Sequence, residues 1–186
     1  PLGLPVTGLA ATAAWLAALA ERDVTAGTAV AGLDEVARHL PTYAVTTSVA
    51  GLEMPEVKLR HHLLSWLPGT VFSISMAGTT LVEVGSASTS RAADPAASTL
   101  VWTGDQRLAP RLGAGAPTEA DRVELAAGED AGRWRRARFY EHCVVPHDVD
   151  AFAERLRARE LARCTHCGDV VSRHCWFCLS QEGAHA

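Results

Sequence analysis

The stretch GTVFSISMAGTTLVEVGS (Gly69–Ser86) gives the clearest structural signal in this chain of 186 residues. In its first half, Phe72, Ile74 and Met76 alternate with two serines. Strict alternation of apolar and polar residues is typical of a strand with one buried face. Gly78 then supplies a tight turn into a second apolar run. The stretch therefore predicts an antiparallel hairpin within a larger sheet.

Three further runs in the chain are β-like and extend the predicted sheet: Thr42–Ala50, Ser98–Gly104 and Arg133–Val145. In the last run, Cys143 shares its parity with apolar residues, while Tyr140 and His142 share theirs with arginines. This alternation predicts one buried face and one basic, polar face. Segments rich in small and polar residues, at 86–97 and 106–117, are expected to be loops.

Two helices are predicted near the N-terminal end of the chain. The first begins at Pro5 or Thr7, and helical spacing places these apolar residues on its inner face: Leu9, Ala13, Leu16 and Ala20. Trp15 and Leu19 widen that face. The second helix covers Thr28–Leu40 and ends before a proline. Together these helices are expected to form a hairpin.

Two more helices are predicted later in the chain. Leucines at helical spacing favour a short helix within Glu56–Gly69. Asp148 is a suitable N-cap for a last helix, in which Phe152 and Leu156 face inward. We expect that helix to continue as far as Cys164.

These elements predict an α+β fold with a mainly antiparallel sheet. The expected segments are an N-terminal helical hairpin (1–41), an antiparallel β-rich core (42–147), a C-terminal helix (148–163), a small zinc-binding knuckle with four cysteine ligands (164–178) and a tail (179–186).

Composition and charge exclude several classes of protein. Hydrophobic residues make up 48% of the chain and charged residues 20%, which is typical of a folded protein and not of a disordered chain. The formal net charge of −4 excludes a polycation that coats nucleic acid over its whole surface. The apolar run Leu9–Ala20 is too short to span a bilayer, and no basic segment precedes it. We therefore expect neither secretion nor a membrane partner.

Four of the five cysteines form a C-x2-C-x7-C-x2-C cluster near the C-terminal end: Cys164, Cys167, Cys175 and Cys178. Two such turns can bring four thiolates around one cation, and a tetrahedral set of four sulfurs is typical of Zn2+. Gly168 suits the left-handed backbone that a Cys-x-x-Cys turn needs. Disulfide-stabilised secreted domains spread their cysteines along the chain, so this clustering indicates reduced thiols and a cytoplasmic location.

Alternatives for the cysteine cluster are an iron–sulfur cluster and dithiol redox chemistry. The spacing differs from that of common iron–sulfur sites, and a redox Cys-x-x-Cys normally stands alone at a helix N-terminus. His166 and His174 lie beside the cysteines and are candidate substitute ligands. Because four thiolates close the coordination shell, the cluster predicts structural zinc rather than a catalytic metal.

The rest of the chain carries no common catalytic motif, whether a P-loop, a dinucleotide fingerprint, a nucleophile elbow or a zincin sequence. Cys143 is expected to be a small buried residue rather than a nucleophile, since His142 points to the opposite face of the predicted strand. The adjacent pair His61 and His62 is expected at the surface, because neighbours on a helix point in different directions.

A dense basic stretch is the one candidate nucleic-acid contact, and it contains Arg133, Arg135, Arg136 and Arg138. Further arginines follow as far as Arg163. The competing interpretation is that these arginines pair with neighbouring acidic residues on a solvated face.

Three functions are compatible with these patterns. The first is a non-enzymatic interaction or assembly subunit of a larger complex or particle, such as a phage or virus, stabilised by structural zinc and assembled in the cytoplasm. The second is a nucleic-acid-binding or transcription-associated zinc protein that uses the arginines of residues 133–163. The third is an enzyme with an active site in the β-rich core. The sequence favours the first.

Overall fold

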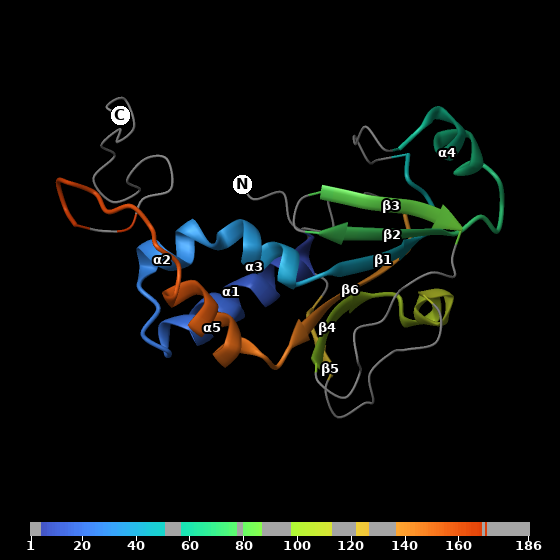
Figure 1. Cartoon of the computed structure of the whole chain (residues 1–186). Coiled ribbons are helices and arrows are strands. Elements are labelled where there is room, and N and C mark those ends of the chain that lie inside the picture. The colour runs from blue at the N-terminus through green and yellow to red at the C-terminus, as the bar shows by residue number, and fades with distance from the viewer. Residues whose placement is uncertain are drawn as a thin grey trace. The chain divides into compact units, whose positions relative to one another are not determined.

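The computed structural model describes residues 5–50, 57–77, 80–86, 98–112, 122–126, 137–168 and 170. Contacts divide the chain into two compact units, each built from separate stretches of sequence. Unit 1 contains residues 1–12 and 37–147, and unit 2 contains residues 13–36 and 148–186. Unit 1 holds the sheet and unit 2 holds helices, and the chain is α+β as predicted (Figure 1).

Unit 1 is organised around a six-stranded sheet with the order β3-β2-β1-β6-β4-β5. Its strands are β1 (Thr42–Thr46), β2 (Phe72–Ala77), β3 (Thr80–Ser86), β4 (Ser98–Gly104), β5 (Arg122–Glu124) and β6 (Phe139–Pro146). Every described pairing is antiparallel except that of β4 with β5, which is parallel. The predicted hairpin is therefore confirmed as β2 and β3, and the sheet is mixed.

Apolar clusters cover both faces of this sheet. One face carries Phe72, Ile74 and Met76 of β2, packed with residues of β1 and the loops that follow it: Ala44, Val49 and Val57. The other face carries Val45, Leu100, Trp102, Tyr140 and Val144. Leu108 closes this second cluster from the 3-10 helix η2 (Gln106–Leu112). Burial on both faces makes the centre of the sheet the core of unit 1.

The prediction of a basic, polar face on the last strand is wrong for residues 140–144, whereas Arg138 is exposed as predicted. Residues 140–144 of β6 are all buried, including Tyr140, Glu141 and His142. The reason is position, because β6 lies between β1 and β4 and both of its faces are covered. Residues 133–136, where the basic pattern is densest, lie outside the described residues.

Helix α1 (Val6–Ala20) is buried on a face that overlaps the predicted one at Trp15 and Leu19 but not at Leu9, Ala13 or Ala20. Thr7, Ala11, Trp15 and Leu19 are buried, whereas Leu9 is half exposed. Two contacts set this rotation. In unit 1, Thr7 is held by Glu141, and in unit 2 the Trp15 ring meets the Phe152 ring edge-on at 5.8 Å between centroids.

The helix predicted over Thr28–Leu40 is divided into α2 (Ala26–Ala31) and α3 (Leu33–His39). Gly32 separates them, and a Cβ atom there would lie 2.7 Å from a methyl carbon of Leu156. Leu156 belongs to α5 (Val149–Arg157), so the break lets α5 approach the backbone closely. The result is two short helices where periodicity predicts one.

Helix α5 is shorter than predicted. It ends at Arg157, and residue 163 instead pairs with Val170 in an isolated antiparallel bridge. Asp148 occupies the N-cap position, but its side chain makes no capping hydrogen bond. Phe152 and Leu156 are buried as predicted.

Two further elements agree with the sequence predictions, and two elements were not predicted. Strand β4 has the predicted bounds, and α4 (Leu59–Leu64) lies within the stretch predicted as a short helix. Sequence patterns missed β5, whose three residues are exposed and lack an apolar period. They also missed η2, which occupies part of a segment predicted as loop.

Candidate functional site

The first half of the cysteine cluster forms a tight turn that follows α5. The backbone N–H of Gly168 donates to the carbonyl oxygen of Cys164 at 2.8 Å, and Gly168 has the left-handed φ of +76° that its sequence position predicts. The Arg163 and Val170 bridge closes the turn on both sides. Arg163 also donates from its guanidinium to the carbonyl oxygen of Gly168 at 3.0 Å.

This turn fits one half of a zinc knuckle. Cys164 is buried and Cys167 is exposed, and both belong to the turn that the hydrogen bond from Gly168 to Cys164 closes. Cys175 and Cys178 lie outside the described residues, as does His174. Within the described stretches, no group of three or more potential metal ligands is formed. His166 is in the same turn and is exposed.

Cys143 and His142 do not form a catalytic pair. Cys143 is fully buried, and its thiol donates to the carbonyl oxygen of Leu40 at 3.6 Å. Burial raises the pKa of this thiol to about 12, with a smaller contribution from nearby Glu141. The thiol is therefore protonated at neutral pH and unreactive, which confirms the prediction of a small buried residue.

His142 lies on the opposite face of β6 among aromatic rings. Its ring centroid is 5.3 Å from that of Tyr43 and 5.8 Å from that of Tyr140. Its Nδ1 is buried and has no hydrogen-bond partner. Burial, with a smaller contribution from the positive charge of Arg122, lowers the pKa of His142 from 6.5 to about 4. The imidazole is therefore neutral at physiological pH.

Glu141 is the most deeply buried acidic residue that the structure describes, and it binds the start of α1. Its Oε1 accepts hydrogen bonds from the backbone N–H of Thr7 at 2.9 Å and from the Thr7 hydroxyl at 2.7 Å. A carboxyl group at a helix N-terminus satisfies amides that have no partner within the helix. The two residues are 134 positions apart, so no local sequence pattern could have revealed this contact.

The prediction that His61 is at the surface is wrong. His61 is buried against the ring of Phe72, and its Nδ1 accepts the backbone N–H of Lys58 at 3.1 Å. Burial lowers the pKa of His61, and the positive charge of Arg60 lowers it further. A polar residue thus anchors α4, while His62 is partly exposed.

The apolar residues of α4 and the following turn face outward instead. The five residues Leu59, Leu63, Leu64, Trp66 and Leu67, here called the α4 ridge, are all exposed. Periodicity correctly predicts a helix here, but it cannot tell which face of so short a helix is buried.

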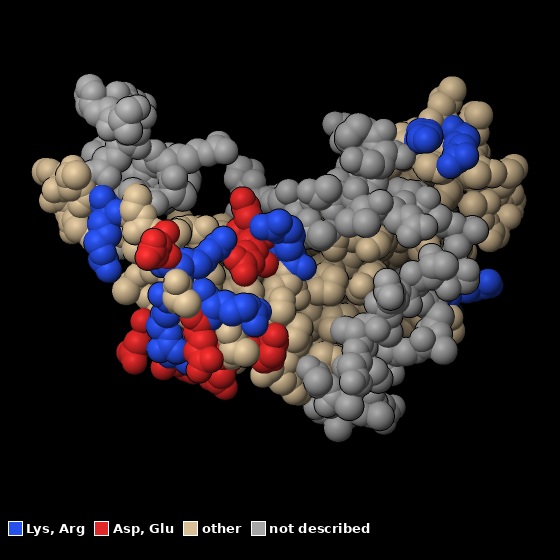
Figure 2. Space-filling view, viewed as in Figure 1, with Lys and Arg blue, Asp and Glu red and all other residues tan. Residues whose placement is uncertain are grey.

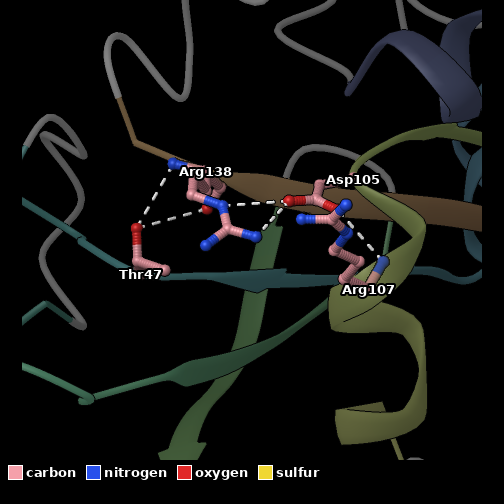
Figure 3. A network of polar contacts seen from close by, with 4 residues as sticks. All are labelled: Thr47, Asp105, Arg107 and Arg138. Carbon is pink, nitrogen blue, oxygen red and sulfur yellow. Dashed lines mark hydrogen bonds and ion pairs between the residues drawn. The ribbon is translucent and has the colours of Figure 1, made fainter.

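Of the four arginines proposed to contact nucleic acid, Arg138 is the one that the structure describes, and it is part of a polar network (Figure 3). Its guanidinium donates to Oδ2 of Asp105, and its backbone N–H donates to the hydroxyl of Thr47 at 3.2 Å. The hydrogen bond from Arg138, with one from the backbone N–H of Arg107, lowers the pKa of Asp105. Arg133, Arg135 and Arg136 lie outside the described residues.

Other arginines pair with acidic residues in unit 2. Arg159 donates to Glu35 at 2.6 Å, and Arg22 pairs with Asp150. Figure 2 shows basic and acidic side chains intermingled over the helices of this unit. These ion pairs are of the kind that the interpretation of a solvated, paired face predicts.

Comparisons with known proteins give no relative for this chain. No protein-family model matches it, and neither a curated protein nor a solved structure is similar to it. In the part of the chain that the structure describes, no helix is long and apolar enough to cross a membrane.

Proposed function

We propose that this chain is a non-enzymatic interaction subunit of a larger assembly and that structural Zn2+ stabilises its C-terminal contact region. In this proposal, zinc is bound by the thiolates of Cys164, Cys167, Cys175 and Cys178. Assembly takes place in the cytoplasm, and the partners are proteins of the same complex or particle.

The observation that carries the proposal is the turn at Cys164 and Cys167. Its closing bridge and its left-handed Gly168 give the backbone shape that a two-cysteine half-site requires. Once four thiolates surround the ion, no position is open for water or substrate, so its contribution is to folding. A short irregular segment has little apolar area to bury, and zinc binding supplies the missing stabilisation.

Native mass spectrometry of the purified chain tests the metal site. The expected result is one zinc per chain, with zinc lost in the Cys164→Ser and Cys167→Ser variants. Cys143→Ser is the matched control, because Cys143 is buried in unit 1 and should leave the zinc content unchanged. Bound iron, no bound metal, or full zinc occupancy without Cys164 would contradict the proposal.

The assembly function needs a separate measurement. A tagged chain, expressed at its natural level, is separated by size from a gentle cell extract. We expect the chain to migrate well above its own mass of 19.7 kDa, and the Cys164→Ser variant to lose this association. Migration of the wild-type chain as a monomer would contradict an assembly function, whatever its zinc content.

A further inference from the structure

The α4 ridge inverts the usual pattern of an amphipathic helix. His61 and Ser65, one helical turn apart, face the protein, whereas the apolar side chains face away from it. Leu59 is 74% exposed, Leu63 63%, Trp66 81% and Leu67 56%. Single exposed leucines are normal on a protein surface, but a contiguous group with a tryptophan marks an interaction site.

Hydrogen bonds fix the outward orientation of the ridge. The Ser65 hydroxyl donates to the carbonyl oxygen of His61 at 2.9 Å and accepts the backbone N–H of Val49 at 3.1 Å. The His61 ring meets the Phe72 ring edge-on, with 6.4 Å between centroids. The polar side of α4 is therefore bound to the apolar cluster of Phe72 and Val49, and the helix cannot rotate its leucines inward without losing these contacts.

The described charged residues around the ridge are positive. Lys58 and Arg60 are exposed at the start of α4, and the described segment 57–77 contains no Asp or Glu. In Figure 2, the coloured charges over α4 are all basic. Glu53 and Glu56, the acidic residues nearest in sequence, lie outside the described residues. The leucines and tryptophan of the α4 ridge thus lie beside cationic side chains, although the net charge of the whole chain is −4.

This combination favours a lipid surface over a second copy of the chain. Leucines that enter the acyl boundary, a tryptophan at headgroup level and lysine or arginine near lipid phosphates are the features of an interfacial anchor. A second copy of the chain would bring Lys58 and Arg60 of both copies together, which like-charge repulsion opposes. Helix α4 lies near the end of the sheet at which β2 begins and β3 ends (Figure 1).

We propose that the α4 ridge is a peripheral anchor that binds the surface of an anionic lipid bilayer. Trp66, Leu63 and Leu67 enter the interface, and Lys58 and Arg60 contact the phosphate groups. The proposal departs from the expectation of no membrane partner, which rested on the lack of a spanning segment and of a secretion signal in the sequence. It does not depend on the zinc site, because every residue involved belongs to unit 1.

Vesicle sedimentation of the chain tests the anchor. We expect the wild type to sediment with vesicles of mixed phosphatidylcholine and phosphatidylserine, and less with phosphatidylcholine alone. The double variant Leu63→Ser/Trp66→Ser should lose affinity by about tenfold or more, since two apolar side chains no longer leave water. Lys58→Gln/Arg60→Gln should lose roughly fivefold per charge for the anionic vesicles alone.

Val123→Ser is the matched control, because Val123 is also an exposed apolar residue, 48% accessible, but lies on β5. It should bind vesicles like the wild type. Absence of wild-type sedimentation with either vesicle, or equal sedimentation of the wild type and the Leu63→Ser/Trp66→Ser variant, would overturn the proposal. So would self-association of the wild type that this double variant abolishes, because a second copy would then cover the ridge.

Discussion

Strand β6 and helix α4 both depart from the rule that apolar residues are buried and polar residues are exposed, but they do so in opposite ways. At the centre of the sheet, β6 buries Glu141 and His142, whereas α4 exposes three leucines and a tryptophan on and just beyond its last turn. In β6 the rest of the chain compensates: Thr7 binds Glu141, and a lowered pKa keeps His142 neutral. For the apolar face of α4, the described residues supply no comparable cover.

The comparison separates residues that stabilise the fold from residues that bind a partner. A buried polar group that has a hydrogen-bond partner, as Glu141 has, is explained by the fold. His142 is neutral and so avoids the larger cost of a buried charge, although its Nδ1 has no hydrogen-bond partner. An exposed apolar group held outward by hydrogen bonds is not explained by the fold, because the chain gains nothing from its exposure. We therefore attribute the polar residues of β6 to folding and the α4 ridge to binding.

The largest expected effect concerns His142. Its pKa is about 4 in the folded chain and near 6.5 when unfolded, so the unfolded state binds more protons between these values. The contribution of His142 to the free energy of unfolding is therefore fully present above pH 6.5. It is lost as the pH decreases toward 4, which lowers the free energy of unfolding by about 3 kcal/mol. Urea unfolding at a series of pH values measures this loss.

The control for this pH dependence uses a second histidine. His142→Gln should remove most of the loss between pH 6.5 and 4, whereas His147→Gln, at an exposed position, should retain it. If the wild type and His142→Gln respond equally to acid, His142 is not held neutral by burial, and the first half of the comparison fails.

A smaller effect is expected at the contact between α1 and β6. Thr7→Val removes the hydroxyl that donates to Glu141 and leaves a buried carboxyl oxygen short of a hydrogen bond. We expect a loss of about 2 kcal/mol in unfolding free energy. Thr7→Ser keeps the hydroxyl and should retain most of the stability. Equal effects of the two substitutions in denaturant unfolding would show that the hydrogen bond to Glu141 is not what matters.

The smallest effect on stability is expected on the ridge. Leu63→Ala should change the unfolding free energy by less than about 0.5 kcal/mol, because the side chain is already in water. Leu100→Ala, in the buried cluster of the sheet, is the matched substitution and should cost about 2–5 kcal/mol. A large loss for Leu63→Ala would place this leucine in the core and end the distinction between the two regions.

Local patterns predicted the elements of this fold better than their environments. The alternation at Phe72, Ile74 and Met76 identified β2 and its buried face, because that strand depends on side-chain parity alone. The same logic failed for β6, since its second face is covered by residues distant in sequence, such as Leu100 and Leu108. Parity shows that a strand has two faces, but it does not show how many of them are covered.

For the candidate sites, residue spacing predicted the turn at Cys164 and Cys167, but it could not predict which face of α4 is buried. The Cys-x-x-Cys-Gly sequence anticipated the left-handed Gly168, because that conformation is a local property of the backbone. Zinc itself stays a prediction. Nothing local distinguishes an α4 that buries His61 from one that buries Leu63, since Phe72 and Val49 decide the outcome through tertiary contacts.

Hydrogen–deuterium exchange of the full chain, with and without vesicles of phosphatidylcholine and phosphatidylserine, compares the two regions in one experiment. Amides of residues 58–67 should gain protection when vesicles are added, because the α4 ridge then leaves water. Amides of β6 residues 140–144 should be protected equally in both conditions, since they are buried within the sheet. Unchanged exchange at residues 58–67, or a vesicle effect centred on β6, would contradict the assignment of binding to α4 and folding to β6.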